Sequence, residues 1–159
     1  MTVPGLTIRP ATPADAVTIA RFNVLLAAES ENRALDPARL ARGVQMLLSD
    51  PERARYWVAE VDGEIRGQCG VTTEWSDWSA GRYWWLQSVY VTPEWRGKGV
   101  LRALWNRILA DARALGDVAA IRLYVEKDNQ GAREAYARLG MAETSYLVYQ
   151  ATLDAEGPP

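Results

Sequence analysis

The sequence predicts one α/β (α+β) domain with a mixed, mostly antiparallel central sheet flanked by helices. Strand-like and helical segments alternate along 159 residues, a length typical of a single compact domain. Asp62-Gly63 separates two strand-like segments by a two-residue loop of type I′ chemistry, which predicts antiparallel pairing there. A strand, a helix and another strand then follow over 83–126, and such a unit pairs its strands in parallel through a right-handed crossover.

The first third of the chain predicts one strand and two helices. Residues 6–9 alternate between apolar and polar, as a short strand does. A proline in the first turn favours an amphipathic helix over about 13–28. A second helix over 37–48 also begins with proline and is closed by Ser49-Asp50-Pro51. The polar connection 29–32 between these helices carries two carboxylates.

The middle third predicts three strands. Residues 56–61 and 64–73 form the predicted hairpin, and 83–91 forms a third strand rich in aromatic and β-branched residues. Between the second and third strands, residues 75–81 are predicted to form a longer turn. Thr92-Pro93 ends the third strand.

The last third begins with a long helix. From Gly99 onward apolar residues recur at spacings of three and four, which predicts a helix that ends at Gly116-Asp117. Its apolar face consists of Leu101, Leu104, Trp105, Ile108, Ala112 and Leu115. Residues 121–126 then alternate as a strand.

One helix and one strand complete the predicted fold. Asn129 can cap a final helix, and Gly140 stands at the C′ position of that helix. Residues 141–153 are strand-like, so a last strand is predicted there. The single predicted domain spans 1–159, with its core in about 6–153 and a tail at 154–159.

The composition excludes several kinds of chemistry. The chain has no histidine and one cysteine, Cys69, so it cannot assemble an imidazole base or a Cys/His metal site, and no metal is predicted. The net charge of −2 argues against a nucleic-acid binder, and no apolar run is long enough to predict a membrane span. Residues 1–10 show no signal-peptide pattern, so a cytoplasmic location is expected.

The segment 89–101 carries the predicted chemistry, because a strand becomes a helix there through the glycine-rich turn Arg96-Gly97-Lys98-Gly99. A helix N-terminus presents unpaired N–H groups and the positive end of the helix dipole, which suit a phosphate. Glycines allow close approach of the backbone, and the two basic side chains add charge. The P-loop pattern does not fit because glycine follows the lysine, and the Rossmann pattern fails because Arg102 stands where its third glycine would be.

Three stretches give the chain a resemblance to the GNAT acetyltransferase superfamily over about 6–153: "VYVTPEWRGKGV" (89–100), "LYVEKDN" (123–129) and "AREAYARLGM" (132–141). Arg96 and Gly99 match the first and fourth positions of the superfamily's acetyl-coenzyme A motif, Gln/Arg-x-x-Gly-x-Gly/Ala. Leu101 departs from the sixth position. The stretch "EWSDW…YWWLQSVYV…GVLRALW" also resembles a bacterial branch of the superfamily. The resemblance implies a GNAT-like acyl-CoA N-acyltransferase fold and an acetyl-CoA-dependent N-acetyltransferase.

The resemblance further implies which residues bind the coenzyme. Backbone groups of Val89 and Val91 would pair with the pantetheine arm as if it were an added strand, and N–H groups of 97–102 would hold the pyrophosphate. Tyr136 would lie beside the thioester sulfur and hydrogen-bond the leaving thiolate. The implied set is Val89, Tyr90, Val91, Arg96, Gly97, Lys98, Gly99, Val100, Leu101, Arg102, Asn129 and Tyr136. Asn129 could equally be a helix cap alone, and Tyr136 a packing residue.

The acceptor is expected at the start of the 83–91 strand in the arrangement that the resemblance implies. Chain order brings the 29–32 connection and the loop after 73 toward that end, and carboxylates beside tryptophans suit a cationic amine. The predicted substrate-binding residues are Glu29, Glu31, Glu74, Trp75, Asp77, Trp78, Trp85 and Gln87. Glu29, Glu74 and Glu126 are the candidate catalytic carboxylates, and a solvated surface role stays open for each.

The predicted reaction moves the acetyl group of acetyl-CoA to an amine of a small molecule or peptide, by direct attack in a ternary complex. A protein N-terminus or a hydroxyl group is the alternative acceptor. A coenzyme-binding module without turnover, or an interaction protein with a structural glycine turn, would need neither Tyr136 nor a base. A homodimer is compatible with the sequence, which does not select an oligomeric state.

Overall fold

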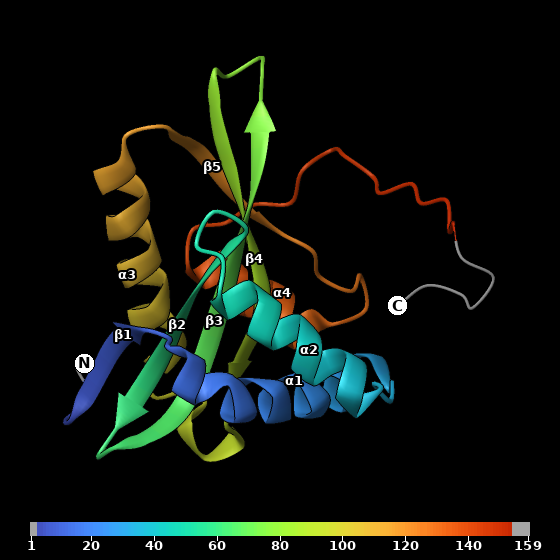
Figure 1. Ribbon diagram of the computed structural model, residues 1–159. Coiled ribbons are helices and arrows are strands. Elements are labelled where there is room, and N and C mark those ends of the chain that lie inside the picture. The colour runs from blue at the N-terminus through green and yellow to red at the C-terminus, as the bar shows by residue number, and fades with distance from the viewer. Residues whose placement is uncertain (1–2, 154–159) are drawn as a thin grey trace.

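A computed structural model describes residues 3–153 and shows a five-stranded sheet with helices on both faces (Figure 1). Strands β1 to β4 are antiparallel neighbours in chain order, and β5 adds to β4 in parallel, so the predicted mixed sheet is confirmed. The elements are β1 (Leu6–Pro10), the 3₁₀ turn η1 (Pro13–Asp15), α1 (Ala16–Glu31), α2 (Pro37–Leu48), β2 (Ala54–Val61), β3 (Glu64–Ser76), β4 (Gly81–Val91), η2 (Pro93–Trp95), α3 (Val100–Leu115), β5 (Val118–Leu123) and α4 (Gln130–Arg138).

Local turn and capping signals explain most element boundaries. Asp62 and Gly63 have φ of 51° and 80°, the paired positive values of a type I′ turn between β2 and β3. Asp36 caps α2 by accepting a backbone N–H. Gly116 and Gly140 both adopt positive φ just after α3 and α4, where a left-handed residue ends a helix.

The hairpin of β3 and β4 is longer than predicted. Both strands extend into the expected turn, since β3 ends at Ser76 and β4 begins at Gly81, and residues 77–80 form the loop. Gly81 permits this arrangement, because a Cβ on it would lie 2.6 Å from the carbonyl oxygen of Asp117. The tip of the hairpin therefore projects from the body of the molecule (Figure 1).

Residues 141–153 form no strand, so the predicted last strand is wrong for the single chain. Met141 packs against the core and the Tyr146 ring centroid lies 5.8 Å from the Arg122 guanidinium of β5, but the chain beyond runs away from the sheet (Figure 1). A strand is stable only when a neighbour takes up its backbone hydrogen bonds, and no strand of the described residues pairs with this segment.

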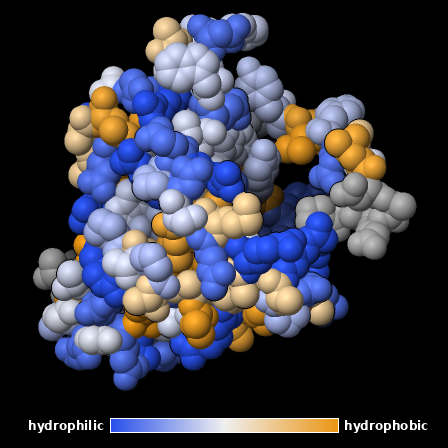
Figure 2. All heavy atoms as spheres, in the orientation of Figure 1, coloured by the Kyte–Doolittle hydropathy of each residue, from blue (hydrophilic) through white to orange (hydrophobic). Residues whose placement is uncertain are grey.

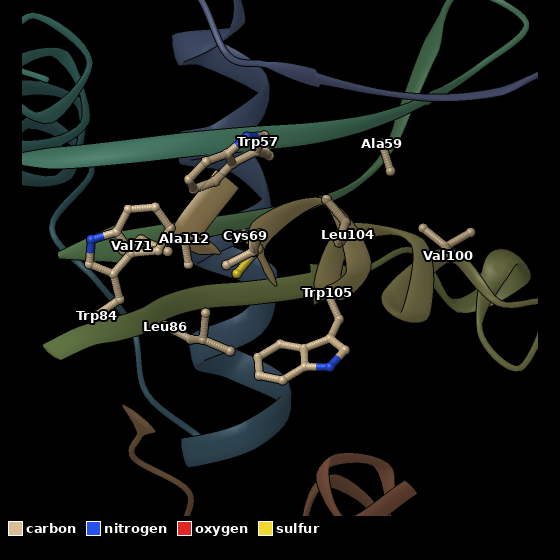
Figure 3. Packing of buried hydrophobic residues seen from close by; sticks show 11 residues of the cluster. Trp57, Ala59, Cys69, Val71, Trp84, Leu86, Val100, Leu104, Trp105 and Ala112 are labelled. Carbon is tan, nitrogen blue, oxygen red and sulfur yellow. The ribbon is translucent and has the colours of Figure 1, made fainter. Parts of the chain in front are cut away.

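Two hydrophobic cores attach the helices to opposite faces of the sheet. On one face, α3 packs on the sheet through a core that contains Trp57, Trp84 and Trp105 (Figure 3). On the other face, α1 and α2 cover β2 through Ile19 and Val44. Within the described residues, no helix is both long enough and apolar enough to cross a membrane.

Candidate active site

Strand β4 loses its outer neighbour halfway along its length. β5 pairs with β4 only as far as Leu86, whereas β4 continues to Val91. On the inner side, pairing with β3 persists to the end of β4, where the Thr92 N–H donates to the Arg66 carbonyl of β3 at 2.9 Å. Because backbone groups alternate sides along a strand, those of Val89 and Val91 point to the outer side. We call the outer side of residues 87–91 the open edge.

A β-bulge lies within the open edge. The register of β3 against β4 shifts between Gln68 and Gly70, so Ser88 and Val89 share one opposing residue. Ser88 has φ of 52°, which is uncommon for a residue other than glycine. The buried Gln68 amide supports the bulge by donating to the Ser88 carbonyl at 3.1 Å and to Asn23 Oδ1 at 2.7 Å. The sequence analysis did not predict a role for Gln68 or Ser88. The available signal was a glutamine inside an otherwise apolar, buried strand.

Helix α3 begins without a side-chain cap, directly after the open edge. Gly99 occupies its N-cap position with φ of 95°, and Gly97 has φ of 72°. Both are left-handed conformations that glycine adopts with little strain. By contrast, Asp36 and Asn129 cap α2 and α4. In the described chain, the first N–H groups of α3 therefore lack partners, a state in which a helix start can bind an anion.

The predicted pyrophosphate-binding residues surround this helix start. Lys98 Nζ lies over the indole of Trp95 in η2, 4.9 Å from the ring centroid. Arg102 donates to a carbonyl at the end of α4 at 3.0 Å, which ties the two helices together. Val100 is buried and Leu101 half-buried behind the turn, so these two residues contribute backbone and packing at this point.

Tyr136 is half-buried on α4, and its hydroxyl makes no hydrogen bond to any residue in 3–153. Burial, and to a lesser extent the proximity of Cys69, raises the pKa of Tyr136 to about 12. The phenol is therefore protonated at neutral pH, and its donor is free. Asn129 is already engaged, because its Oδ1 accepts the N–H of Ala132 at 3.1 Å as a helix cap. A contact of Asn129 with coenzyme stays a prediction.

Glu29 does not lie with the other predicted acceptor carboxylates. It accepts the Tyr90 hydroxyl at 3.1 Å and forms an ion pair with Arg96 at 2.6 Å. Glu74 pairs in register with Tyr83, seven residues before Tyr90, so the two carboxylates are separated by about 23 Å along β4 at about 3.3 Å per residue. The ring centroids of Phe22 on α1 and Tyr90 lie 5.0 Å apart, which shows that α1 runs toward the open edge. Chain order does not reveal this direction.

The first half of β4 carries aromatic rings and charges of both signs. Trp85 donates from Nε1 to Glu74 at 2.7 Å, and its ring stacks on Tyr124 at 4.6 Å. The Arg122 guanidinium lies 3.8 Å from the Tyr83 ring centroid and 5.7 Å from that of Trp85. We call these five residues the aromatic cluster. Glu74 and Trp85, both predicted to bind the acceptor, thus meet in the aromatic cluster. Arg122, which the sequence analysis did not predict there, lies beside them.

The other predicted acceptor and base residues are dispersed. Gln87 is half-buried between the aromatic cluster and the open edge, and its Nε2 donates to Thr72 at 3.3 Å. Exposed side chains make up the rest of the set: Glu31, Trp75, Asp77, Trp78 and Glu126. The structure does not gather the four carboxylates predicted to bind the acceptor (Glu29, Glu31, Glu74 and Asp77) into one site, because Glu29 and Glu74 are separated along β4.

A hollow of about 580 Å³ lies elsewhere, between α2, β2 and the end of α3. Its one carboxylate among the described residues is paired, since Asp111 accepts from Trp57 Nε1 and from Arg107, each at 2.9 Å. None of the site residues predicted from sequence lines it. The open edge and the helix start beside it are therefore the candidate active site.

The fold is one found in acetyltransferases. The crystal structure of a possible acetyltransferase from Clostridium difficile 630 is 40% identical, with a TM-score of 0.88 over 94% of this chain and 98% of that one. A predicted acetyltransferase from Clostridium acetobutylicum, solved with acetyl-CoA, shares the fold at 19% identity, with a TM-score of 0.75 over 92% of this chain and 96% of that one.

Sequence comparison identifies the family. Residues 21–141 match the model of the acetyltransferase (GNAT) family. The aminoglycoside N(6′)-acetyltransferase type 1 of Stenotrophomonas maltophilia is 32% identical over 147 residues, which cover 90% of each chain. An uncharacterized N-acetyltransferase of Methanocaldococcus jannaschii is 32% identical over 89 residues, 55% of this chain and 39% of that protein. The chain belongs to the GNAT acetyltransferase family and is an acetyltransferase.

Proposed function

We propose that the chain transfers the acetyl group of acetyl-CoA to an amine of a small molecule, by direct attack of the amine in a ternary complex. The open edge of β4, which leads into the uncapped start of α3, is the observation that carries this proposal. Tyr136 adds a free donor near Cys69, the residue opposite the bulge.

The residues at the open edge fit the chemistry of acetyl-CoA. Pantetheine carries amides that need backbone partners, and Val89 and Val91 have backbone groups on the unpaired side. The pyrophosphate needs N–H donors and positive charge, which the start of α3 offers together with Arg96 and Lys98. Bound there, the coenzyme supplies the acetyl thioester.

Two donors of the chain would stabilise the charges that develop during transfer. As the C–N bond forms, the Val89 N–H in the bulge would donate to the carbonyl oxygen. As the C–S bond breaks, the Tyr136 hydroxyl would donate to the sulfur. A thiol has an ordinary pKa of about 8.5, whereas the pKa of Tyr136 is about 12. Tyr136 would therefore stabilise the thiolate by a hydrogen bond and keep its own proton.

The attacking amine must first lose a proton. An alkylamine with a pKa of about 10.4 is neutral in about one molecule in 2,500 at pH 7, a penalty of about 4.6 kcal/mol. Glu29 at the open edge and Glu126 just beyond β5 are the proposed carboxylates for this step, directly or through water. Glu74 lies on β3 opposite Tyr83 in the first half of β4, and it is proposed to bind the acceptor instead.

The aromatic cluster is the proposed acceptor site. Glu74 can pair with an ammonium group, and the Tyr124 ring, which is 60% exposed, is available for cation–π contact. The name of the Stenotrophomonas relative points to aminoglycosides, and this supports a small-molecule amine here.

A thiol-release assay with acetyl-CoA tests the proposal. The panel should contain aminoglycosides, polyamines, amino acids, peptides with free N-termini, and alcohols matched to the amines. We expect release with small amines and acetylated product by mass spectrometry. Release only with alcohols or peptides would overturn the acceptor class. Acetyl-CoA binding by calorimetry without release for any compound would favour a module without turnover.

A further inference from the structure

Arg122 is a cation held by aromatic rings and not by a carboxylate. Its guanidinium lies 3.8, 5.7 and 5.8 Å from the ring centroids of Tyr83, Trp85 and Tyr146. Within residues 3–153 no carboxylate pairs with it, whereas Arg82 on β4 has a carboxylate at 2.8 Å. Ring contacts leave the N–H donors of a guanidinium unpaired, and these donors match the two oxygens of a carboxylate. Arg122 can therefore bind an anionic group of a ligand.

Glu74 carries the opposite charge on the other side of β4. In the sheet, Trp85 pairs with Thr72 of β3 on one side and with Arg122 of β5 on the other. Glu74 lies two residues after Thr72 on β3 and accepts the Trp85 Nε1 hydrogen at 2.7 Å. A carboxylate has about four acceptor sites, so this one hydrogen bond leaves Glu74 able to bind an ammonium group. The aromatic cluster thus offers one positive and one negative group to a ligand.

The aromatic cluster lies on the face of the sheet that α3 does not cover. Trp84 belongs to the core under α3, so alternation along β4 places Tyr83 and Trp85 on the opposite face. The core under α1 and α2 is built on β2 and, among the described residues, includes none of the cluster. Figure 2 shows mainly hydrophilic and intermediate colours over the projecting hairpin, on which the side chain of Glu74 is exposed. A small molecule can therefore reach the cluster from solvent.

The distance along β4 selects the kind of amine. Trp85 lies four residues before Val89, whose N–H is the proposed donor to the acetyl carbonyl. At about 3.3 Å per residue, these two positions are about 13 Å apart. An amine on the same carbon as the carboxylate cannot span this distance while Arg122 holds that carboxylate. An amine at the end of a carbon chain can approach, past the half-buried Gln87 midway between the two positions.

We propose that the acceptor is a basic amino acid with a free carboxylate, and that its side-chain amine receives the acetyl group. This inference rests on the proposed function. Arg122 binds the carboxylate, Glu74 binds the α-ammonium group, and the side chain of the amino acid extends along β4 past Gln87. The side-chain amine, neutral after losing a proton, forms the C–N bond to the acetyl carbon as the C–S bond breaks. The further proton that the nitrogen loses ends on the sulfur, so coenzyme A leaves as the thiol.

Four amines of matched chain length test the two contacts in the unmodified protein. Lysine carries both charges of the head group, lysine amide and cadaverine lack the carboxylate, and aminocaproic acid lacks the α-ammonium group. In the thiol-release assay, kcat/KM should be about 10- to 100-fold higher for lysine than for the other three, because each contact is charge-assisted. Mass spectrometry with fragmentation should find the acetyl group on the side-chain nitrogen.

The outcomes separate this inference from the proposed function. Equal kcat/KM for lysine and cadaverine, a higher kcat/KM for aminoglycosides, or acetylation of the α nitrogen would overturn the inference and leave the proposed function standing. Absence of thiol release with every amine would overturn the proposed function itself. Acetylation only of peptides that end in lysine, which have no free α-ammonium group on that residue, would overturn the role of Glu74 and with it the inference.

Variants assign the two contacts. Arg122→Met removes the charge, so the preference for lysine over cadaverine should disappear, and Arg122→Lys should keep part of it because the forked donors are lost. Glu74→Gln should instead remove the preference for lysine over aminocaproic acid. Arg113→Met is the matched control, because Arg113 is exposed on α3, which packs on the other face. A preference that persists in Arg122→Met, with an unchanged circular dichroism spectrum and acetyl-CoA Kd, or that is lost in the control would refute the inference. If Arg122→Met does not fold, the comparison of lysine with cadaverine in the unmodified protein decides.

Discussion

The two halves of β4 have the same inner neighbour and differ on their outer side. Along residues 82–86, β5 takes up the outer backbone groups, so only side chains are left to interact with a ligand. Along 87–91, no strand of the described residues pairs with the backbone on that side, where Arg96 Nε donates to the Val91 carbonyl at 2.8 Å, and the bulge at Ser88 is held by the buried Gln68. In the proposed function, the first half would therefore recognise a ligand through the side chains of the aromatic cluster, and the second half through backbone N–H and C=O groups.

This difference divides the proposed work between the two substrates. Backbone recognition suits the constant chain of a coenzyme, because amides bind amides whatever the side chains. Side-chain recognition suits a particular acceptor. Changes in the second half should therefore alter acetyl-CoA binding or the chemical step, and changes in the first half should alter the KM of the acceptor.

The largest effect is expected for Tyr136→Phe. The change removes one hydroxyl that has no hydrogen bond in the described chain, so stability should hold while kcat falls about 10- to 10⁴-fold. The acetyl-CoA Kd should stay near that of the unmodified protein in calorimetry. If kcat is unchanged when chemistry limits the rate, Tyr136 only packs.

The raised pKa of Tyr136 also sets the pH profile. Only the protonated phenol donates, and a pKa raised from 10 to about 12 moves the loss of this donor to higher pH. We therefore expect kcat to rise with pH as the amine or its base deprotonates, and Tyr136 should cause no descending limb below about pH 10. A descending limb near neutral pH that Tyr136→Phe abolishes would contradict this assignment.

The next effect is expected at the helix start, for Gly97→Ala. Gly97 has φ of 72° with open space around an added Cβ, so the protein should lose about 1 kcal/mol of stability through backbone strain. The acetyl-CoA Kd should rise about 10- to 100-fold, since one or two charge-assisted hydrogen bonds to the pyrophosphate are disturbed.

Gly116→Ala is the matched control at the other end of α3. Gly116 has φ of 79° and equally open space, so its replacement should lower the melting temperature by a similar amount. Its acetyl-CoA Kd should not change. Equal effects of the two variants on the Kd would mean that the glycine turn acts through stability alone.

A smaller effect is expected on β3, at the residue opposite the first half of β4. Glu74→Gln keeps the hydrogen bond from Trp85 and removes the charge, so the acceptor KM should rise about 10-fold, the loss of about 1.5 kcal/mol for one charged contact. Glu64→Gln at the far end of the same strand is the control. A change in the acetyl-CoA KM instead would contradict the proposal that the first half of β4 binds the acceptor and the second half binds the coenzyme.

Sequence patterns predicted the turns of the chain better than the side-chain contacts across the sheet. The glycine turn, the uncapped helix start and the hairpin at Asp62-Gly63 arise from residues that are neighbours in the chain, and local propensity is sufficient to find them. The aromatic cluster joins residues of three segments, and Arg122 enters it only through the parallel register of β5 against β4. No local pattern sets that register.

Contacts between distant parts of the chain also explain why Glu29 lies away from the predicted acceptor end and why the predicted last strand does not form. The position of Glu29 depends on the direction in which α1 crosses the sheet, which follows from contacts such as Gln68 with Asn23. The segment 144–153 has strand propensity, but pairing needs an edge that the single chain does not bring to it. Propensity describes what a segment can form, and the tertiary or quaternary partner decides whether it does.

The smallest effect is expected for Glu29→Gln, which tests the junction of α1 with the open edge. Glu29 and Arg96 are 41% and 48% exposed, so their ion pair should contribute about 0.2–1 kcal/mol. If Glu29 positions Arg96 for the pyrophosphate, the acetyl-CoA Kd rises about 1.4- to 5-fold and kcat is retained. That increase should vanish in the background of Arg96→Gln, because a double-mutant cycle isolates the pair. If Glu29 is instead the base, kcat falls in both backgrounds and its rise with pH is lost. An unchanged Kd together with an unchanged kcat would exclude both roles, and Glu126 would then be the remaining carboxylate near the open edge.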